Sequence, residues 1–541
     1  MNGKEELYES LRKYAASDFY PWHMPGHKRR LVEFDNPFSM DITEIDGFDD
    51  LHHPEGILKE AMEEAAAVYG SEKTYFLVNG SSCGILAAIS AAVPPGGKLL
   101  MARNCHKSAY HAALLQQARV TYIYPEPEAE GFYGAVQAED VEAALQADPD
   151  IRAVIVVSPG YEGVVSDIRA IAEAAHAHDC ALLVDEAHGA HLPFGKGCGL
   201  DFPASALEMG ADAVIQSLHK TLPSLTQTAL LHLGRNSGAR MDRARVELYL
   251  RIYQSSSPSY IFMASIDHCI RLMAGEAGKQ LMKVYAVNLK WARSRLREQL
   301  HVLRLYEPEL PVYDPSKFVI VSESEAADGP RLADMLRKNY HLEPEMSTDR
   351  YIILMSSPAD TKEGFERMVH ALTEIDRMLE RQTASVCVTE CEAVSGSTAG
   401  RKSVSGSTAE RKSVSGCMAE AETVWAMLPD RAPKAVMKSS EAAVSQGSPV
   451  PLSRSAGRVC RDFIYIYPPG IPLLVPGEQI EEHHLELIRT WQKHHLEVHG
   501  IRRMEGQTDG SEVKQTDGRT AGQEGDRTDG QGPDKWEILC I

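Results

Sequence analysis

The sequence lacks a membrane-spanning run, a secretory signal and a cysteine pair of the kind that binds metal. No apolar run approaches the length needed to cross a membrane. The charged start of the chain, residues 1–6, has no apolar stretch of the kind found in secretory signals. The ten cysteines are scattered without a Cys-x-x-Cys pair, a pattern that is against a metal site and favours reduced thiols. We therefore expect a cytoplasmic protein with no metal ion and no membrane partner.

Basic residues are scarce relative to acidic ones. The 541 residues include 56 Lys and Arg against 76 Asp and Glu, which leaves a formal net charge of −20. Because clustered Lys and Arg are needed to bind phosphate backbones, this balance is against a nucleic-acid partner. It agrees with a cationic small-molecule substrate, although acidic residues also serve solubility.

Predicted strands and helices alternate through the first half of the chain. Apolar runs typical of buried strands lie at 74–78, 98–101, 151–157, 180–184 and 213–216. Residues at helical spacing lie between them, as at Asp167 and the apolar positions that follow it. This alternation indicates an α/β protein with an open, largely parallel sheet covered by helices on both faces. Ligands of such sheets bind at the carboxyl ends of the strands.

The pattern changes after about residue 275. A long predicted helix, 277–300, is followed by short strands and indicates a smaller α+β domain. A ten-residue Ser/Gly/Thr/Lys repeat begins at Val394, and it has too few large apolar residues to order itself. The expected organisation is an N-terminal arm 1–50 that lies on another surface, a large domain 51–275, a small domain 276–383 and 457–503, a low-complexity disordered insert 384–456, and a disordered tail 504–541.

Two residues at predicted strand ends carry the most specific chemistry. Asp185 ends the strand 180–184, and Lys220 lies in Ser-Leu-His-Lys after the strand 213–216. A lysine can hold an aldehyde cofactor as an imine, and an aspartate at a strand end can keep the cofactor's ring nitrogen protonated. Together they suit pyridoxal 5′-phosphate (PLP), which needs both groups. Either residue alone has an ordinary interpretation, a solvated lysine or an aspartate that forms a turn.

Serines near these residues suit a phosphate group. Ser81 and Ser82 join a predicted strand to a helix N-terminus, where free backbone N–H groups bind anions. Ser217 and His219 flank the lysine and can reach the same phosphate or the imine. The alternatives are that the serines act as a helix N-cap and that His219 makes a structural hydrogen bond.

Two further histidines follow predicted strands. The imidazole of His106 can stack on a pyridine ring, and His188 can hydrogen-bond Asp185 or the ring oxygen of the cofactor. A single histidine at such a position is more often a surface or capping residue.

Seven segments together resemble the Orn/Lys/Arg decarboxylases, PLP-dependent enzymes with the aspartate-aminotransferase-like fold. The segments lie at 25–28, 41–51, 79–82, 103–108, 185–188, 217–223 and 467–478. The length is similar to that of the shorter biosynthetic members of the family. The resemblance implies that Lys220 forms the Schiff base, that Asp185 pairs with the ring nitrogen, and that His106 stacks on the ring. It also implies that Ser81, Ser82, Ser217 and His219 hold or border the phosphate, and that Lys220 or a neighbouring histidine returns a proton to the substrate.

The resemblance also implies a basic amino acid as substrate and a homodimer or higher homo-oligomer. The acidic residues Glu478, Glu44 and Asp46 are expected near the substrate entrance, where two chains meet. Decarboxylation of L-arginine to agmatine, which serves polyamine synthesis, is favoured over reaction with lysine or ornithine. The alternatives are another reaction of this fold, such as transamination, and a PLP-binding protein without activity.

Overall fold

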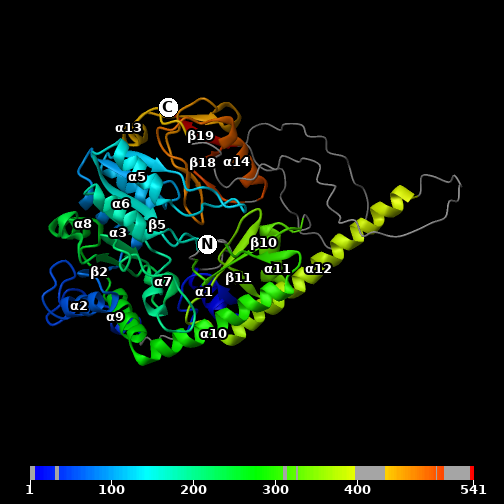
Figure 1. Cartoon of the computed structure of the whole chain (residues 1–541), viewed down its shortest axis with the longest axis horizontal. Coiled ribbons are helices and arrows are strands. Elements are labelled where there is room, and N and C mark those ends of the chain that lie inside the picture. The colour runs from blue at the N-terminus through cyan, green and yellow to red at the C-terminus, as the bar shows by residue number, and fades with distance from the viewer. Residues whose placement is uncertain are drawn as a thin grey trace.

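The computed structural model describes residues 7–30, 36–308, 313–324, 327–395, 433–494, 496–504 and 536–541, without the side chains of 383–395. The greater part of the Ser/Gly/Thr/Lys repeat and the Thr-Asp-Gly repeats near the end fall outside these residues. Figure 1 shows a large α/β unit, a smaller α+β unit flanked by long helices, and a C-terminal unit beside the large one. No helix of the described residues is both long and apolar enough to span a membrane.

The large domain is built on a seven-stranded sheet of order β2-β8-β7-β6-β5-β3-β4. Its five strands from β7 to β4 pair in parallel, whereas β8 runs antiparallel to both β2 and β7. The expected open, largely parallel sheet is therefore confirmed. Its strands are β2 (Lys73–Leu77), β3 (Lys98–Ala102), β4 (Arg119–Ile123), β5 (Ile151–Val157), β6 (Ala181–Asp185), β7 (Ala213–Gln216) and β8 (Ala229–Leu233).

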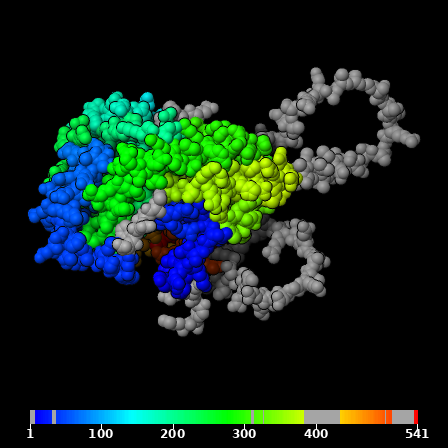
Figure 2. Space-filling view, turned by 90° about the horizontal axis from the view of Figure 1, so that it is seen from below, coloured from blue at the N-terminus to red at the C-terminus, as the bar shows by residue number. Residues whose placement is uncertain are grey.

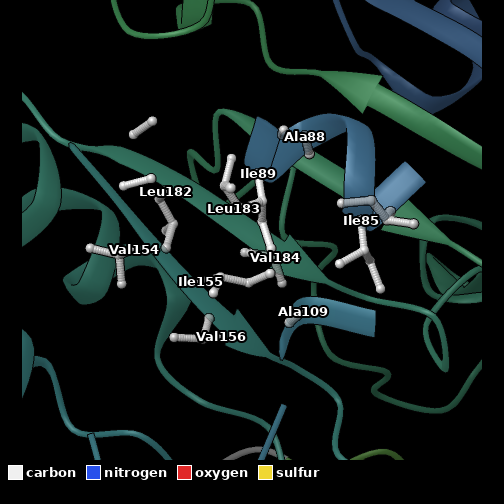
Figure 3. Close-up of a cluster of buried hydrophobic side chains, with 14 of the residues drawn as sticks. Ile85, Ala88, Ile89, Ala109, Val154, Ile155, Val156, Leu182, Leu183 and Val184 are labelled. Carbon is white, nitrogen blue, oxygen red and sulfur yellow. The ribbon is translucent and has the colours of Figure 1, made fainter. Parts of the chain in front are cut away.

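Helices cover both faces of this sheet. Alternate residues of β2 separate the two faces, since Phe76 packs with α2 and α9 whereas Tyr75 and Leu77 pack with α3. Figure 3 shows Ile89 of α3 beside Leu183 and Val184 of β6 within the larger cluster. The helices are α2 (Ile57–Tyr69), α3 (Gly80–Ala92), α4 (Lys107–Leu115), α5 (Ala138–Ala147), α6 (Ile168–Ala177), α7 (Leu218–Thr221), α8 (Arg243–Tyr253) and α9 (Tyr260–Ala274).

Two helix ends follow from local sequence chemistry. The Asp167 side chain caps α6 by accepting a hydrogen bond from the Ala170 N–H at 3.1 Å, as the sequence predicts. Gly70 ends α2 with a φ of 74°, in the left-handed region that glycine adopts without strain.

The small domain carries the four-stranded antiparallel sheet β12-β13-β10-β9. Figure 1 shows α10 and α12 side by side along this domain. Its elements are α10 (Glu276–Gln299), β9 (Leu303–Leu305), β10 (Lys317–Ser322), α11 (Gly329–Tyr340), β11 (Leu342–Pro344), β12 (Met346–Ser347), β13 (Tyr351–Met355) and α12 (Lys362–Ser395).

The C-terminal unit has two three-stranded sheets, β14-β19-β18 and β16-β15-β17. They surround a core that includes Leu485, Ile488 and Trp491 of α14. Its elements are α13 (Ser439–Val444), β14 (Ser448–Pro451), β15 (Ile464–Ile466), β16 (Pro472–Leu474), α14 (Glu482–Lys493), β17 (Val498–His499), β18 (Ile501–Arg503) and β19 (Trp536–Cys540).

Two expected boundaries are wrong for the described residues of this unit. Strand β14 lies inside the expected insert 384–456, and β19 lies inside the expected tail 504–541. The two strands pair with each other in antiparallel register from Ser448↔Cys540 to Pro451↔Glu537. The physical reason is that neither short segment has a core of its own: β14 pairs with β19, and β19 also pairs with β18 and buries Ile538 and Cys540 in the core of the unit. Polar flanking sequence hid this long-range pairing.

The N-terminal arm also differs from expectation, because its residues 7–30 pack on their own chain. Strand β1 (Tyr20–Trp22) pairs in parallel with β11. Trp22 is fully buried among aromatic rings of the small domain. Figure 2 shows this N-terminal segment, which includes α1 (Leu7–Ala16), against the green-to-yellow small domain. The apolar core that the arm lacks is supplied by this domain.

Candidate active site

A cavity of about 300 Å³ lies at the carboxyl ends of the large-sheet strands. Strands β2, β3, β5, β6 and β7 all lead into segments that line it, as expected for an open parallel sheet. The N-terminal arm adds Met24 and Pro25, and the segment 466–473 of the C-terminal unit closes another side. Six of the seven segments that carry the family resemblance therefore contribute to the cavity, and the segment 41–51 does not line it.

Lys220 and His188 meet at the centre of the cavity. The Lys220 Nζ lies 3.0 Å from the His188 Nε2, and both residues line the cavity wall. Burial and the nearby ammonium hold the pKa of His188 well below its usual range, so the imidazole is neutral and accepts this hydrogen bond. Burial also lowers the pKa of Lys220, against the opposing effect of Asp185. A lysine with a lowered pKa is a better nucleophile at neutral pH.

Asp185 ends β6 and is 5% exposed. Its Oδ1 accepts a hydrogen bond from the Ala187 N–H at 3.1 Å, which orients the carboxylate toward the cavity that it lines. Burial raises the pKa of Asp185, and the charge of Lys220 opposes this rise. The pair predicted from the sequence thus lies in one cavity.

Helix α3, which carries the predicted anion site at its N-terminus, begins before Ser81 and Ser82. The sequence predicts a turn over 79–84, whereas α3 starts at Gly80, whose φ is +78°. Ser81 therefore lies in the first helical turn and lines the cavity, while Ser82 is exposed and does not line it. Ser217 is fully buried and does not line the cavity, and its hydroxyl has no hydrogen-bond partner among the described residues.

His219 lines the cavity and also makes a structural hydrogen bond. Its Nδ1–H donates to the Thr228 carbonyl at 2.9 Å, which leaves Nε2 free to accept. Burial lowers the pKa of His219 to about 4, so the ring is neutral at physiological pH. The structural hydrogen bond of His219 is therefore confirmed, and its contact with the phosphate or the imine stays a prediction.

His106 connects the cavity to the C-terminal unit. It caps α4, with its Nδ1 2.8 Å from the Ser108 hydroxyl, and it lines the cavity. The loop that contains Gly470 covers its ring, because a Cβ built at Gly470 would lie 3.2 Å from the His106 Nε2. The neighbouring Lys107 N–H donates to the Gly470 carbonyl at 3.0 Å. Burial lowers the pKa of His106 to about 3, so a neutral ring faces the cavity.

Comparison with known proteins places this arrangement in a family. Residues 5–344 match the family model described as Orn/Lys/Arg decarboxylase, major domain, and residues 416–522 match its C-terminal domain. The chain belongs to the Orn/Lys/Arg decarboxylase family. It is 31% identical to the arginine decarboxylase of Bacillus subtilis over 89% of this chain and 92% of that protein. It is also 31% identical to the arginine decarboxylase of Halalkalibacterium halodurans over 91% of this chain and 94% of that protein.

Solved structures agree on the fold of this decarboxylase. The Francisella novicida lysine decarboxylase LdcF superimposes with a TM-score of 0.69 over 98% of this chain and 80% of that chain, at 18% identity. Lysine decarboxylase A from Pseudomonas aeruginosa gives a TM-score of 0.67 over 99% and 82%, also at 18% identity. The expected aspartate-aminotransferase-like fold is therefore confirmed.

The three acidic residues expected at the entrance do not line the cavity. Glu478 is 2% exposed, and both of its oxygens accept hydrogen bonds from the Arg103 guanidinium, at 2.9 and 3.0 Å. A carboxylate engaged in this way is not available to a substrate, so the expected role of Glu478 is wrong. Glu44 and Asp46 lie on an exposed segment away from the cavity of their own chain, and their expected role stays a prediction about a partner chain.

The sequence analysis missed a polar group that the decarboxylase cavity contains. Glu162 lies just beyond β5, is 8% exposed, and accepts a hydrogen bond from the Tyr351 hydroxyl at 2.9 Å. The adjacent Tyr161 packs its ring 4.8 Å from that of His188. Asp185 was predicted because it lies at the carboxyl end of a strand. Tyr161 and Glu162 follow the carboxyl end of β5, so the same reasoning could have identified them.

Proposed function

We propose that this chain decarboxylates L-arginine to agmatine and CO2 with pyridoxal 5′-phosphate as cofactor. The observation that carries the proposal is the meeting of Lys220, Asp185 and His188 in one buried cavity at the strand ends. Family membership supplies the class of reaction, and the geometry supplies a role for each residue.

The residues of the cavity fit this cofactor. Ser217 has a buried hydroxyl without a partner among the described residues, and Ser81 lies in the first turn of α3, whose N–H groups suit a phosphate. Asp185 would face the ring nitrogen, and the neutral ring of His106 would lie against the pyridine. Bound here, PLP supplies the electron sink for the pair of electrons left when CO2 departs.

Lys220 and His188 would handle the proton that replaces CO2. The two nitrogens are 3.0 Å apart, within the range for direct proton transfer. Because burial and the nearby ammonium hold the pKa of His188 well below its usual range, the neutral ring would accept the hydrogen bond of the lysine ammonium and orient it without taking its proton. The Lys220 ammonium would deliver the proton to the substrate α-carbon, and Asp185 would keep the positive charge of the ring nitrogen in place.

The cavity favours decarboxylation over transamination. An aminotransferase holds the substrate carboxylate with an arginine, whereas the described residues that line this cavity include no arginine. A loosely held carboxylate in an apolar setting is the ground state from which CO2 leaves most readily. Met24, Ile471 and Leu473 supply apolar wall in this cavity.

The choice of arginine is supported by the relatives named arginine decarboxylase, which are 28–31% identical to this chain over most of its length. Relatives named for lysine and ornithine are 22–24% identical. The test is an assay for agmatine, cadaverine and putrescine after incubation of the purified chain and PLP with arginine, lysine and ornithine. Agmatine should form fastest. Absence of any amine, with a visible cofactor band present, would favour a PLP-binding protein without activity.

A homodimer in which Glu44 and Asp46 approach the partner's cavity belongs to the same proposal. The segment around them exposes Phe38 to 88%, Ile45 to 50% and Phe48 to 45%, an apolar surface that suits a subunit interface. Mixing a Lys220→Ala chain with a chain mutated at Glu44 and Asp46 tests whether two chains contribute residues to one active site. Activity regained in the mixed dimers supports it, and no activity above that of the separate variants would contradict it.

A further inference from the structure

Glu162 is a buried carboxylate in the cavity wall without a cationic partner. Its Oε1 accepts the Tyr351 hydroxyl, and none of the ion pairs among the described residues includes it. Burial raises its pKa to about 7, with the Tyr351 hydroxyl opposing the rise. A buried carboxylate without a counter-charge is costly, so it either takes up a proton or is stabilised by a bound cation.

Other acidic groups around the cavity are already engaged. Asp185 is the second carboxylate in the cavity wall, and it lies beside Lys220. Glu345, just outside the wall, accepts the Tyr161 hydroxyl at 2.5 Å and the Met24 N–H at 2.8 Å, which occupies both of its oxygens. Glu162 is therefore the carboxylate of this region with capacity for a further cation.

The backbone at Glu162 is held in place. Its carbonyl accepts the Tyr313 hydroxyl at 2.9 Å. The next residue, Gly163, has a φ of +104°, and a Cβ there would lie 2.9 Å from the Tyr313 ring. Only glycine fits this turn without displacing the ring. The carboxylate is therefore fixed before any ligand binds, which reduces the entropy lost on binding.

Aromatic rings surround this end of the cavity. Phe132, Tyr133, Tyr161 and Tyr351 line it, and the Phe132 and Tyr351 ring centroids are 5.5 Å apart. A planar guanidinium stacks on such rings and forms hydrogen bonds with a carboxylate at its edge, whereas an ammonium is a compact, strongly hydrated charge. The surroundings of Glu162 match the guanidinium better than an ammonium.

We propose that Glu162 binds the distal cationic group of the substrate, a guanidinium in preference to an ammonium, and that it sets the specificity of the site. The proposal rests on the proposed function and deepens it, because it names the residue that recognises the side chain of the amino acid. Tyr351 positions the Glu162 carboxylate by donating to one oxygen, and the other oxygen accepts from the ligand.

The test compares Glu162→Gln with the wild-type enzyme loaded with PLP. The matched control is Glu247→Gln, since Glu247 also accepts a tyrosine hydroxyl, that of Tyr75 at 3.0 Å, but does not line this cavity. Three quantities are measured: kcat and KM for L-arginine, the dissociation constant of agmatine by calorimetry, and the inhibition constant of L-citrulline, a neutral analogue of the same shape. The visible cofactor absorbance checks that each variant is folded and loaded.

Removing one partner of a buried charge pair should lower kcat/KM for arginine by about 30-fold or more in Glu162→Gln, chiefly through KM. Agmatine binding should weaken by a similar factor. Citrulline inhibition should stay within about threefold of wild type, because the glutamine amide still hydrogen-bonds a neutral urea. Glu247→Gln should match wild type in all three.

Two results would overturn the proposal while the wild-type enzyme still decarboxylates arginine. One is an unchanged preference for arginine in Glu162→Gln. The other is a parallel loss of arginine, agmatine and citrulline binding, which would mean that Glu162 only supports the fold. If the wild-type enzyme acts on lysine or ornithine instead, the proposed function fails, and the same comparison with norleucine or norvaline as the neutral analogue still decides the role of Glu162.

Discussion

Arg103 and Glu478 lie 375 residues apart in sequence and form a fully buried, bidentate ion pair between the large domain and the C-terminal unit. The Arg103 side chain is completely buried and also donates to the Leu473 carbonyl at 3.0 Å. Leu473 belongs to the segment that closes the cavity. The pair therefore holds the roof of the active site in place.

Breaking this pair should destabilise the enzyme more than removing it altogether. Glu478→Gln leaves the buried Arg103 charge without its counter-charge, which costs about 3–5 kcal/mol. The double variant Arg103→Met/Glu478→Gln removes the uncompensated charge and should recover part of the loss. Thermal unfolding of the two variants and the wild-type enzyme measures this. A Glu478→Gln variant as stable as wild type would contradict the structural role assigned to the pair.

Lys220→Ala should abolish both activity and the visible cofactor band. Lys220 is the only lysine among the described residues that line the cavity, and the ring nitrogen of His188, 3.0 Å from its Nζ, cannot take its place as a primary amine. Absorbance spectra and an amine assay measure the two effects. A band of unchanged intensity would place the attachment of the cofactor elsewhere.

Asp185→Asn should retain the cofactor and lose activity by about 100-fold or more, the range seen when one electrostatic group of an active site is removed. The phosphate contacts proposed for Ser81 and Ser217 would not involve this carboxylate, so binding should persist. The comparison is between kcat of the variant and its cofactor content. Near-normal kcat would contradict the pairing of Asp185 with the ring nitrogen.

The pH dependence of the enzyme should report the Glu162 carboxyl. Its pKa is raised to about 7 by burial, and the ionised form is needed to bind a cation. As pH rises through about 7, kcat/KM for arginine should therefore increase, since kcat/KM follows the free enzyme. Glu162→Gln should lose this limb of the profile. An identical limb in both enzymes would assign it to another group.

The raised pKa of Glu162 also makes the stability of the folded enzyme depend on pH. The unfolded chain releases the Glu162 proton near the ordinary value of 4.5, whereas the folded chain keeps it until about pH 7. Between these values the folded state binds more protons, so the contribution of this group to stability falls as pH rises. Glu162→Gln should lessen that fall when unfolding is followed between pH 5 and 7 without substrate.

Alternation of apolar strands and helices was enough to predict the large domain. Strand β5 has the predicted bounds, and Asp185 and Lys220 were assigned to one rim because parallel strands end on the same edge. Helix spacing also predicted α10, whose bounds are within one residue of those expected. These features depend on local periodicity, which a sequence displays directly.

Features that depend on long-range pairing could not be predicted in this way. Glu478 lies in the segment 467–478 that resembles the decarboxylase family, but nothing in that segment reveals that Arg103 neutralises it. Strand β19 is five residues long and follows polar sequence, so its pairing with β14 is visible only in three dimensions. The entrance role of Glu478 and the extent of the insert and tail were wrong for this reason.

Because β14 lies inside the expected insert 384–456, the two ends of that insert should respond differently to replacement. Replacing 396–415, within the polar Ser/Gly/Thr/Lys repeat, with a Gly/Ser linker of equal length should leave activity unchanged, since the repeat has few large apolar residues and long flexible connections cost little closure entropy. Replacing 433–451 in the same way should lower the melting temperature, because it removes β14 and the Gln479 N–H bond to the Lys434 carbonyl at 2.8 Å. Equal effects of the two replacements would contradict the conclusion that β14 belongs to the folded C-terminal unit.

The most direct test of the proposed activity is the ratio of kcat/KM for L-arginine to that for L-lysine, measured on the wild-type enzyme with saturating PLP. A guanidinium that donates to the second oxygen of the Glu162 carboxylate and stacks on aromatic rings should give a ratio above about tenfold, equivalent to about 1.4 kcal/mol of transition-state binding. Agmatine should be the main product from a mixture of the two amino acids. A ratio at or below one, or the absence of any amine product, would contradict the account.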